Sequence, residues 1–343
     1  MAVTRKSDVQ IAVPQLWSAR LLAEAEKMTT FHRFEGPEGS NMPVIRKDEL
    51  IGQPGDTIKV DLVLALTNAG TDAARTSEST LLEGNEEKVV FRQMSFSPAI
   101  LKHGVRWSKV SAIQITHSMR QTALAQLKKW LAGKLDNKVF AEFTGSGSTI
   151  PTQNLWFAGA ATSIGTVTSA LGVTLSDISD MKAYAKTQLL IEPMRGDNGE
   201  EVYGLILHPY AALTLKKDAS YQTANREAQL RGSTNPLFTG AIASWDGVAI
   251  YEAPRVPTAL DGTSGAQVAR NIFFGAQALM RGYGYYPDWK EQEFSYGEEI
   301  GIATFTLVGQ QASVFDFSAA GDGSGNRAVG HMIFYSAAPA PVA

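Results

Sequence analysis

The side chains that could serve catalysis or bind a metal are scattered along this chain. Its five histidines are His32, His103, His117, His208 and His331, and no two of them lie three or four residues apart. Metal sites usually show that kind of clustering. The histidines are therefore interpreted as structural or surface residues, and the sequence predicts no metal site.

The glycine-rich stretches look like phosphate-binding loops but do not match their patterns. Residues 145–148 follow a predicted helix instead of opening one. Residues 321–326 fit neither Gly-x-x-x-x-Gly-Lys nor Gly-x-Gly-x-x-Gly. The chain also lacks the Gly-x-Ser-x-Gly motif of one large class of hydrolases. Both stretches are interpreted as linkers, and no cofactor or catalytic residue is predicted.

An acidic block offers charge without a catalytic arrangement. Glu83, Glu86 and Glu87 are predicted on an extended segment, where neighbouring side chains point to opposite faces. Such carboxylates do not form a pair that shares a proton. The block is expected to be a solvated loop or a contact with another subunit.

A long helix carries most of the opposite charge. Its basic residues outnumber the acidic Asp136 and Glu142; they are Arg120, Lys128, Lys129, Lys134 and Lys138. One interpretation is a solvated polar face. The other is a basic stripe that meets the acidic block of an adjacent subunit.

The elements that must position these residues follow from hydrophobic periodicity. Residues 57–66 alternate as a strand, residues 88–96 return as a second strand, and the small, polar residues 68–79 form the tip between them. This hairpin has little core of its own, so its expected partner is another copy of the chain. Residues 116–143 form the clearest helix, with Leu127 and Leu131 on its buried stripe and Lys128 and Lys129 off it.

Shorter helices and strands are predicted before and after the hairpin and the long helix. A helix is predicted from Pro14 through Met28, and a second over residues 175–189 with Ser176 as its N-cap. The remaining predicted strands cover residues 202–207, 247–252, 271–280, 300–308 and 331–335. Because strands and helices do not alternate regularly, the predicted class is α+β and not a doubly wound parallel sheet.

Bulk properties exclude several classes of protein. The 343 residues carry a formal net charge of −3, so they show no general attraction to nucleic acid. The absence of cysteine excludes disulfides and thiolate chemistry. No apolar stretch reaches the ~18 residues of a membrane span, and no signal peptide opens the sequence. Synthesis in the cytosol without a membrane partner is expected.

Several segments resemble the coat proteins of tailed bacteriophages, in particular the family typified by the podophage N-four. The matching segments are Leu16-Trp17-Ser18, Gly55-Asp56-Thr57-Ile58, Leu82-Glu83-Gly84-Asn85-Glu86-Glu87, Lys102-His103-Gly104-Val105-Arg106, and the helix end from Trp130 to Phe140. The resemblance is strong over residues 14–144 and only architectural beyond them. Gly104 stands where the family is expected to have Ala.

The resemblance implies the Hong Kong 97-like capsid fold. Residues 1–45 would form the N-terminal arm and residues 46–108 the extended loop. Residues 109–175 would form the peripheral domain with its spine helix, residues 176–293 the axial domain, and residues 294–343 the return to the peripheral domain. The implied function is a non-enzymatic major capsid protein, located in the virion, that assembles into hexamers and pentamers of an icosahedral head around double-stranded DNA.

The resemblance also implies partners. These are other copies of the chain, a separate scaffolding protein, a portal, possible decoration proteins and packaged DNA through weak contacts. The residues expected to touch a neighbouring subunit are Trp17, Glu83, Glu86, Glu87, Lys128 and Lys129. Because the N-terminal helix would dock on a neighbour, deleting residues 1–30 is expected to leave a folded subunit that no longer closes shells. The alternatives are an encapsulin-like compartment shell and an enzyme with an unrecognised site.

Overall fold

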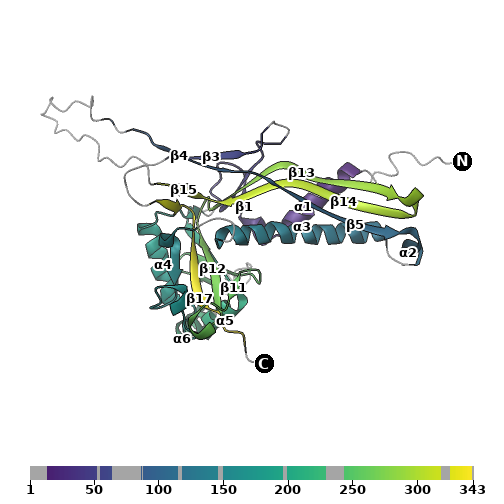
Figure 1. The fold of residues 1–343 in the computed structure, drawn as a ribbon. Coiled ribbons are helices and arrows are strands. Elements are labelled where there is room, and N and C mark those ends of the chain that lie inside the picture. The colour runs from purple at the N-terminus through teal and green to yellow at the C-terminus, as the bar shows by residue number, and fades with distance from the viewer. Residues whose placement is uncertain are drawn as a thin grey trace.

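A computed structural model describes most of the chain. The described residues are 14–51, 55–63, 86, 88–114, 118–145, 150–195, 199–228, 243–317 and 325–341, with the side chains of residues 14–20 and 225–228 left out. Figure 1 shows a long, slender layer joined to a second body that hangs below one end of it. The two parts are built on different sheets.

The long layer is a five-stranded sheet backed by two helices. Its strand order is β1 (Glu35–Gly36), β2 (Val44–Lys47), β13 (Leu279–Phe294), β14 (Glu299–Ala312) and β5 (Ala99–Ser108). The pairs β1–β2 and β2–β13 are parallel, whereas β13–β14 and β14–β5 are antiparallel. The strands β13 and β14 are 16 and 14 residues long, which gives the layer its length.

The spine helix α3 (Met119–Phe143) lies along this sheet (Figure 1). Its 25 residues correspond to about 37 Å at 1.5 Å per residue. Leu127 and Leu131 are each only 1% exposed, and Leu135 is fully buried, which confirms the predicted apolar stripe. These residues pack with Trp289, Ile302 and Val308 of the sheet, so the helix is held by burial of that stripe.

The N-terminal helix α1 (Pro14–Lys27) begins at proline, as predicted, and belongs to the same layer. Leu21 and Ala25 are fully buried in one cluster with Leu124 and Leu127 of α3 and Tyr283 of β13. The expectation that this helix docks on a neighbouring subunit and not on its own core is therefore wrong for residues 21–27, whose side chains the structure describes. The reason is that its apolar face completes the core between the spine helix and the sheet of its own subunit.

The predicted long hairpin is present as a separate two-stranded sheet. Strands β3 (Ile58–Val63) and β4 (Phe91–Phe96) pair antiparallel, with Ile58 opposite Phe96. Residues 64–66 of the first predicted strand and the predicted tip at residues 68–79 lie outside the described residues.

The base of the hairpin has more core than the sequence indicated. Ile58, Val60, Met94 and Phe96 are each less than 10% exposed, and they pack against Met280 and residues of β2 and β15 (Val314–Asp316). The expectation of little core is thus wrong at the base, because the hairpin's alternating apolar face lies on the five-stranded sheet. Strand β15 pairs with β16 (Asn326–Ala328) in a further small sheet.

The second body is an eight-stranded mixed sheet flanked by helices (Figure 1). Its main strand order is β6 (Leu155–Phe157), β17 (His331–Ala337), β12 (Val268–Phe274), β8 (Glu201–Leu207), β10 (Val248–Glu252) and β9 (Ala243–Trp245). Strands β7 (Met194–Arg195) and β11 (Thr258–Ala259) pair with β8 and β12. The accompanying helices are α4 (Leu175–Thr187), α5 (Pro209–Lys217) and α6 (Ala219–Ala228).

Two local predictions in this body are corrected. The single strand predicted over residues 271–280 is two strands, β12 and β13, because the chain turns at Gly275–Ala278 and Gln277 adopts a positive φ of 52°. The N-cap of α4 is Thr174 and not Ser176. The Thr174 side chain accepts a hydrogen bond from the Asp177 backbone N–H, and the Asp177 carboxylate accepts one from the Thr174 backbone N–H, which together form a capping box.

The sheets do not divide at the boundaries that the sequence suggested. Residues 279–293 are expected in the axial domain together with residues 201–207, but as β13 they lie in the five-stranded sheet, apart from β8. Residues 331–337 are expected in the peripheral domain together with residues 300–308, but as β17 they lie in the eight-stranded sheet, apart from β14. The α+β class stands, since helices and mostly antiparallel strands occupy separate layers.

Candidate functional site

The basic stripe of α3 is largely occupied within the subunit. The Arg120 guanidinium donates to the Glu291 carboxylate at 2.5 Å, and the Lys128 ammonium pairs with Glu24 of α1. Lys128 is only 8% exposed, so the prediction that it lies off the buried face is wrong. The physical reason is that α1 covers this flank of α3, so the helix is buried along two sides and not one.

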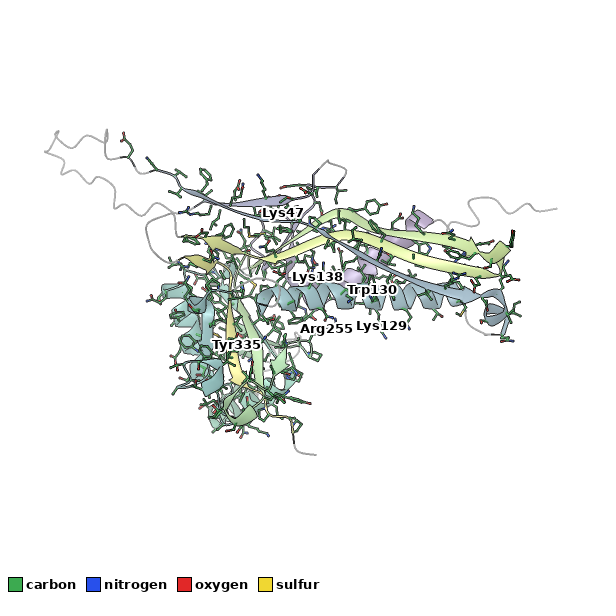
Figure 2. All side chains as sticks on the ribbon, viewed as in Figure 1. Lys47, Lys129, Trp130, Lys138, Arg255 and Tyr335 are labelled. Atoms are coloured by element: carbon green, nitrogen blue, oxygen red, sulfur yellow. The ribbon has the colours of Figure 1, made fainter. Side chains whose placement is uncertain are left out.

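Lys129 remains a candidate contact residue. Its side chain is exposed and points away from the sheet, whereas Lys138 points towards it (Figure 2). The Lys138 ammonium lies 3.5 Å from the Val308 carbonyl oxygen, and burial lowers the pKa of Lys138. Of Lys128 and Lys129, the two lysines predicted to contact a neighbouring subunit, only Lys129 has an exposed side chain.

The other predicted contact residues are only partly described. Glu86 is exposed, while Glu83 and Glu87 lie outside the described residues. Trp17 lies in α1, but its side chain is also outside them. The contact of the acidic block with the basic stripe of an adjacent subunit therefore stays a prediction.

Exposed apolar side chains gather at two places that sequence reasoning missed. The outer part of the hairpin exposes Val63 (56%), Val89 (55%) and Phe91 (63%). The short helix α2 (Lys109–Gln114) exposes Val110 (64%) and Ile113 (83%) at the far end of the long layer (Figure 1). Large apolar groups left in water mark interaction surfaces when they lie together. Both ends of the elongated subunit thus offer surfaces to a partner.

A charged cluster lies where α1, β1, β2 and β13 meet, and no sequence spacing predicted it. Arg281 is fully buried, and its guanidinium donates to the Glu35 carboxylate at 2.6 Å. The Tyr283 hydroxyl donates to Glu26 at 3.2 Å, and Arg46 pairs with the same Glu26 at 3.3 Å. These residues are far apart in sequence, so only the folded sheet brings them together.

Burial and mutual repulsion control the charges in this cluster. Burial raises the pKa of Glu26, and the nearby Glu35 carboxylate raises it further. Burial lowers the pKa of Arg281 more than any single neighbour raises it, but the nearby Glu35 and Glu26 carboxylates, Tyr283 and the hydrogen bond to Glu35 together raise the pKa above its ordinary value. The cluster therefore retains a charged Arg281–Glu35 pair inside the protein, which needs good geometry to offset its desolvation.

The described part of the chain shows no arrangement typical of catalysis or metal binding. Among the described residues, no group of three or more His, Cys, Asp or Glu side chains could hold a metal ion. His331 is fully buried beside the Phe143 ring, at 5.0 Å between ring centroids, and His103 stacks on Trp130 at 4.8 Å. His117 and the glycine-rich residues 146–149 and 318–324 lie outside the described residues. No described helix has the length and apolar character needed to cross a membrane.

Comparison with known proteins decides the family. Residues 9–340 match the family model described as phage capsid protein. The chain belongs to the phage capsid protein family. This is a family of structural proteins and not of enzymes. The match runs through both bodies, so it covers the segments beyond residue 144 where the sequence resemblance was only architectural.

Individual relatives agree with this assignment. The chain is 29% identical over 345 aligned positions to the major capsid protein of Pseudomonas phage KPP25, covering 86% of this chain and 87% of that protein. The capsid of Ralstonia phage GP4 superposes with a TM-score of 0.77 at 22% identity, covering 92% of both chains. The capsid asymmetric unit of cyanophage Pam1 gives 0.74 at 19% identity, covering 91% of this chain and 92% of that one. This chain therefore has the Hong Kong 97-like fold.

Proposed function

We propose that this chain is the major capsid protein of a tailed phage and assembles into hexamers and pentamers of an icosahedral head around double-stranded DNA. The observation that carries the proposal is the family match along residues 9–340. The identity to a curated major capsid protein supports it over most of both chains. The same match favours a phage capsid over an encapsulin-like compartment shell.

The shape of the subunit supports assembly. It is elongated, and two groups of exposed apolar residues lie at separated places on it, one on the hairpin and one on α2 (Figure 1). A subunit that contacts different neighbours with different surfaces can form closed shells, because heterologous contacts close into rings when the rotation permits. We assign the five-stranded layer with α3 to the peripheral domain and the eight-stranded body to the axial domain. Within this scheme, β3 and β4 form the base of the extended loop.

The contact residues of this assembly include Lys129, Glu86 and the hairpin. Lys129 is exposed on the spine helix, and Glu86 is exposed beyond the outer end of the hairpin, before strand β4 begins. We propose that Glu83, Glu86 and Glu87 meet basic groups of an adjacent subunit and that Trp17 contacts a neighbour. A scaffolding protein, a portal, decoration proteins and weakly bound DNA are proposed as the further partners.

Negative-stain electron microscopy of the purified protein tests the proposal. Shells, capsomers or tubes are expected, with a sedimentation coefficient far above that of one subunit. Particles that stay small and globular at high protein concentration and across salt conditions would contradict the proposed assembly.

A further inference from the structure

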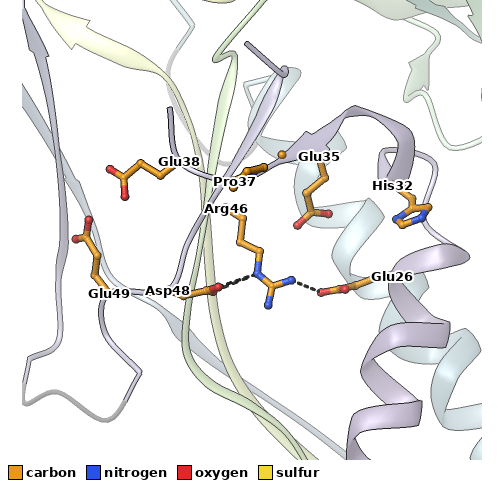
Figure 3. A pocket seen from close by; sticks show the side chains of 9 residues that line it. Glu26, His32, Glu35, Pro37, Glu38, Arg46, Asp48 and Glu49 are labelled. Carbon is orange, nitrogen blue, oxygen red and sulfur yellow. Dashed lines mark hydrogen bonds and ion pairs between the residues drawn. The ribbon is translucent and has the colours of Figure 1, made fainter. Parts of the chain in front are cut away.

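An acidic pocket opens between the end of α1 and the strands β1 and β2 (Figure 3). Its volume is about 670 Å³, within the range of pockets that hold small ligands. The carboxylates that line it come from three segments of the chain; they are Glu26, Glu35, Glu38, Asp48 and Glu49. None of the contact residues proposed above lines this pocket.

In the part of the chain that the structure describes, the cations paired with these carboxylates do not balance them. Arg46 pairs with Glu26 at 3.3 Å and with Asp48 at 3.1 Å. Lys47 pairs with Glu38 at 2.6 Å and with Glu49 at 3.3 Å. With Arg281 on Glu35, three cations face five carboxylates. When all five are ionised, the pocket keeps an excess of two negative charges.

One carboxylate at the pocket has an unused acceptor. The Glu35 side chain is only 10% exposed, and its Oε2 accepts from Arg281 at 2.6 Å. Its Oε1 is buried and has no hydrogen-bond partner in the described part of the chain. Figure 3 shows this carboxylate turned into the pocket towards Arg46. A buried, unpaired carboxylate oxygen is costly, so a cationic donor that reaches it would be stabilised.

We propose that the acidic pocket receives a lysine or arginine side chain from a second copy of the chain. This inference rests on the proposed function, since assembly supplies that second copy. A side chain fits the site better than a metal ion, because no group of three described ligands could hold a metal. The hairpin, which projects from the subunit, carries the exposed lysines Lys59 and Lys88 as donors of the required kind (Figure 1).

A double variant, Asp48→Asn with Glu49→Gln, isolates the excess charge. It removes two pocket carboxylates but leaves Arg46 paired with Glu26 and Lys47 paired with Glu38. The matched control is Glu201→Gln with Asp246→Asn. It removes two exposed carboxylates that pair with Lys186 and Lys182 in the other body. Both variants change the net charge by the same amount.

The measurement is the rate at which purified shells dissociate in denaturant, followed by light scattering. Shells of the pocket variant are expected to dissociate about tenfold faster than wild-type shells, because losing one side of a charge pair mainly raises dissociation. Control shells should dissociate at the wild-type rate. Equal rates for the pocket variant and the wild type would overturn the proposal. A pocket variant whose isolated subunit is destabilised as much as its shell would also overturn it.

Zero-length carbodiimide crosslinking identifies the donor. Shells assembled from isotopically heavy and light subunits should give mixed-isotope links between a pocket carboxylate and a lysine. An arginine donor gives no such link but still produces the faster, salt-sensitive dissociation. Stabilisation of the isolated wild-type subunit by Mg²⁺ or spermidine, absent in the pocket variant, would assign the pocket to a small cation and overturn the proposal. Absence of wild-type shells would instead contradict the proposed function itself.

Discussion

At the scale of single residues, Lys128 shows how a charged side chain can belong to the core. Its aliphatic stem is buried between α1 and α3, and its ammonium reaches Glu24 at the edge of that interface. Long basic side chains often bury their stems while the charged end remains near water. Lys128 therefore contributes packing as well as charge, whereas the side chain of its neighbour Lys129 is exposed.

This difference predicts opposite results for two adjacent substitutions. Lys128→Ala should lower the free energy of subunit unfolding by about 1–2 kcal/mol, through lost packing and a broken ion pair. Lys129→Ala should stay within about 0.5 kcal/mol of wild type. Denaturant unfolding of the isolated subunit measures both changes. A Lys128→Ala variant as stable as Lys129→Ala would show that the α1–α3 contact does not hold Lys128.

His331 predicts an acid sensitivity of the fold. Burial lowers the pKa of His331 to about 3, and neither ring nitrogen has a hydrogen-bond partner in the described part of the chain. Its pKa in the unfolded chain is about 6.5, so the unfolded state binds the proton more readily. Stability from this group is complete above pH about 6.5 and falls by about 1.4 kcal/mol per pH unit down to pH about 3.

The substitution His331→Leu removes this titration and keeps the site apolar. Unfolding free energies measured between pH 4 and pH 6, a range chosen from the pKa values above, should show a slope smaller by about one proton than that of the wild type. The slope is informative even where the variant's absolute stability has changed. Identical slopes in the two proteins would mean that His331 is hydrated or paired in solution.

The burial of Lys128 and of His331 could not be predicted from the sequence. The stripe through Leu127 and Leu131 was predictable, because helical periodicity is a local property. The burial of Lys128 depends on α1, which lies about a hundred residues earlier, and the Arg281–Glu35 pair joins positions still farther apart. Local patterns do not contain such contacts, so only the folded structure shows them.

At the scale of elements, helix α4 is fixed by its first turn. Thr174 and Asp177 satisfy each other's backbone donors, with the Thr174 N–H donating to Asp177 at 3.2 Å. Asp177 also accepts a hydrogen bond from the Gly159 N–H at 3.0 Å, which ties the helix start to the strand region before it. The capping box therefore positions α4 as well as stabilising it.

The two hydroxyls near this start should differ in importance. Thr174→Ala is expected to lower the free energy of unfolding by about 0.5–2 kcal/mol, since it leaves the Asp177 N–H without its side-chain acceptor. Ser176→Ala should change it by less than about 0.5 kcal/mol, because Ser176 reaches only Asp180 at 3.4 Å on the surface. Thermal or denaturant unfolding of both variants decides the matter. If Ser176→Ala lowered the free energy of unfolding more than Thr174→Ala, Ser176 would be the N-cap of α4.

The order of the larger elements was predictable, and their layers were not. The hairpin strands, the spine helix and the N-terminal helix follow from alternation, helical spacing and the position of Pro14. The placement of β13 and β17 in different sheets is another matter, because nothing local in either segment specifies its sheet. Their placement is decided by pairing with distant strands, and β-pairing is strongly context-dependent.

At the scale of the whole molecule, the two bodies are joined by short and specific contacts. The Arg255 guanidinium, which follows β10 of the eight-stranded body, donates to the Gly133 carbonyl of the spine helix at 2.9 Å and to Asn137 at 3.2 Å. Phe143, at the end of that helix, packs in one cluster with Ile272 and Phe274 of β12. The subunit therefore has a continuous core from the spine helix into the second sheet.

Helix α1 is part of that continuity, which predicts the outcome of truncation. Beyond its own buried residues, the segment that follows it donates hydrogen bonds from the Thr30 N–H and hydroxyl to the buried Asp136 of α3. Removing residues 1–13 should preserve the far-UV circular dichroism and the unfolding midpoint of the subunit. Removing residues 1–30 should lower both, because it exposes the α3–β13 core and leaves Asp136 without these donors.

Sedimentation beside circular dichroism separates folding from assembly in this pair. If the shorter deletion stays folded but forms no shells, residues 1–13 act between subunits. If the longer deletion keeps the wild-type fold and midpoint, the packing of Leu21 and Ala25 does not stabilise the subunit, and α1 serves a neighbour after all. The expected result is loss of the fold only in the longer deletion, since a helix of 14 residues that completes a core stabilises the subunit by its burial.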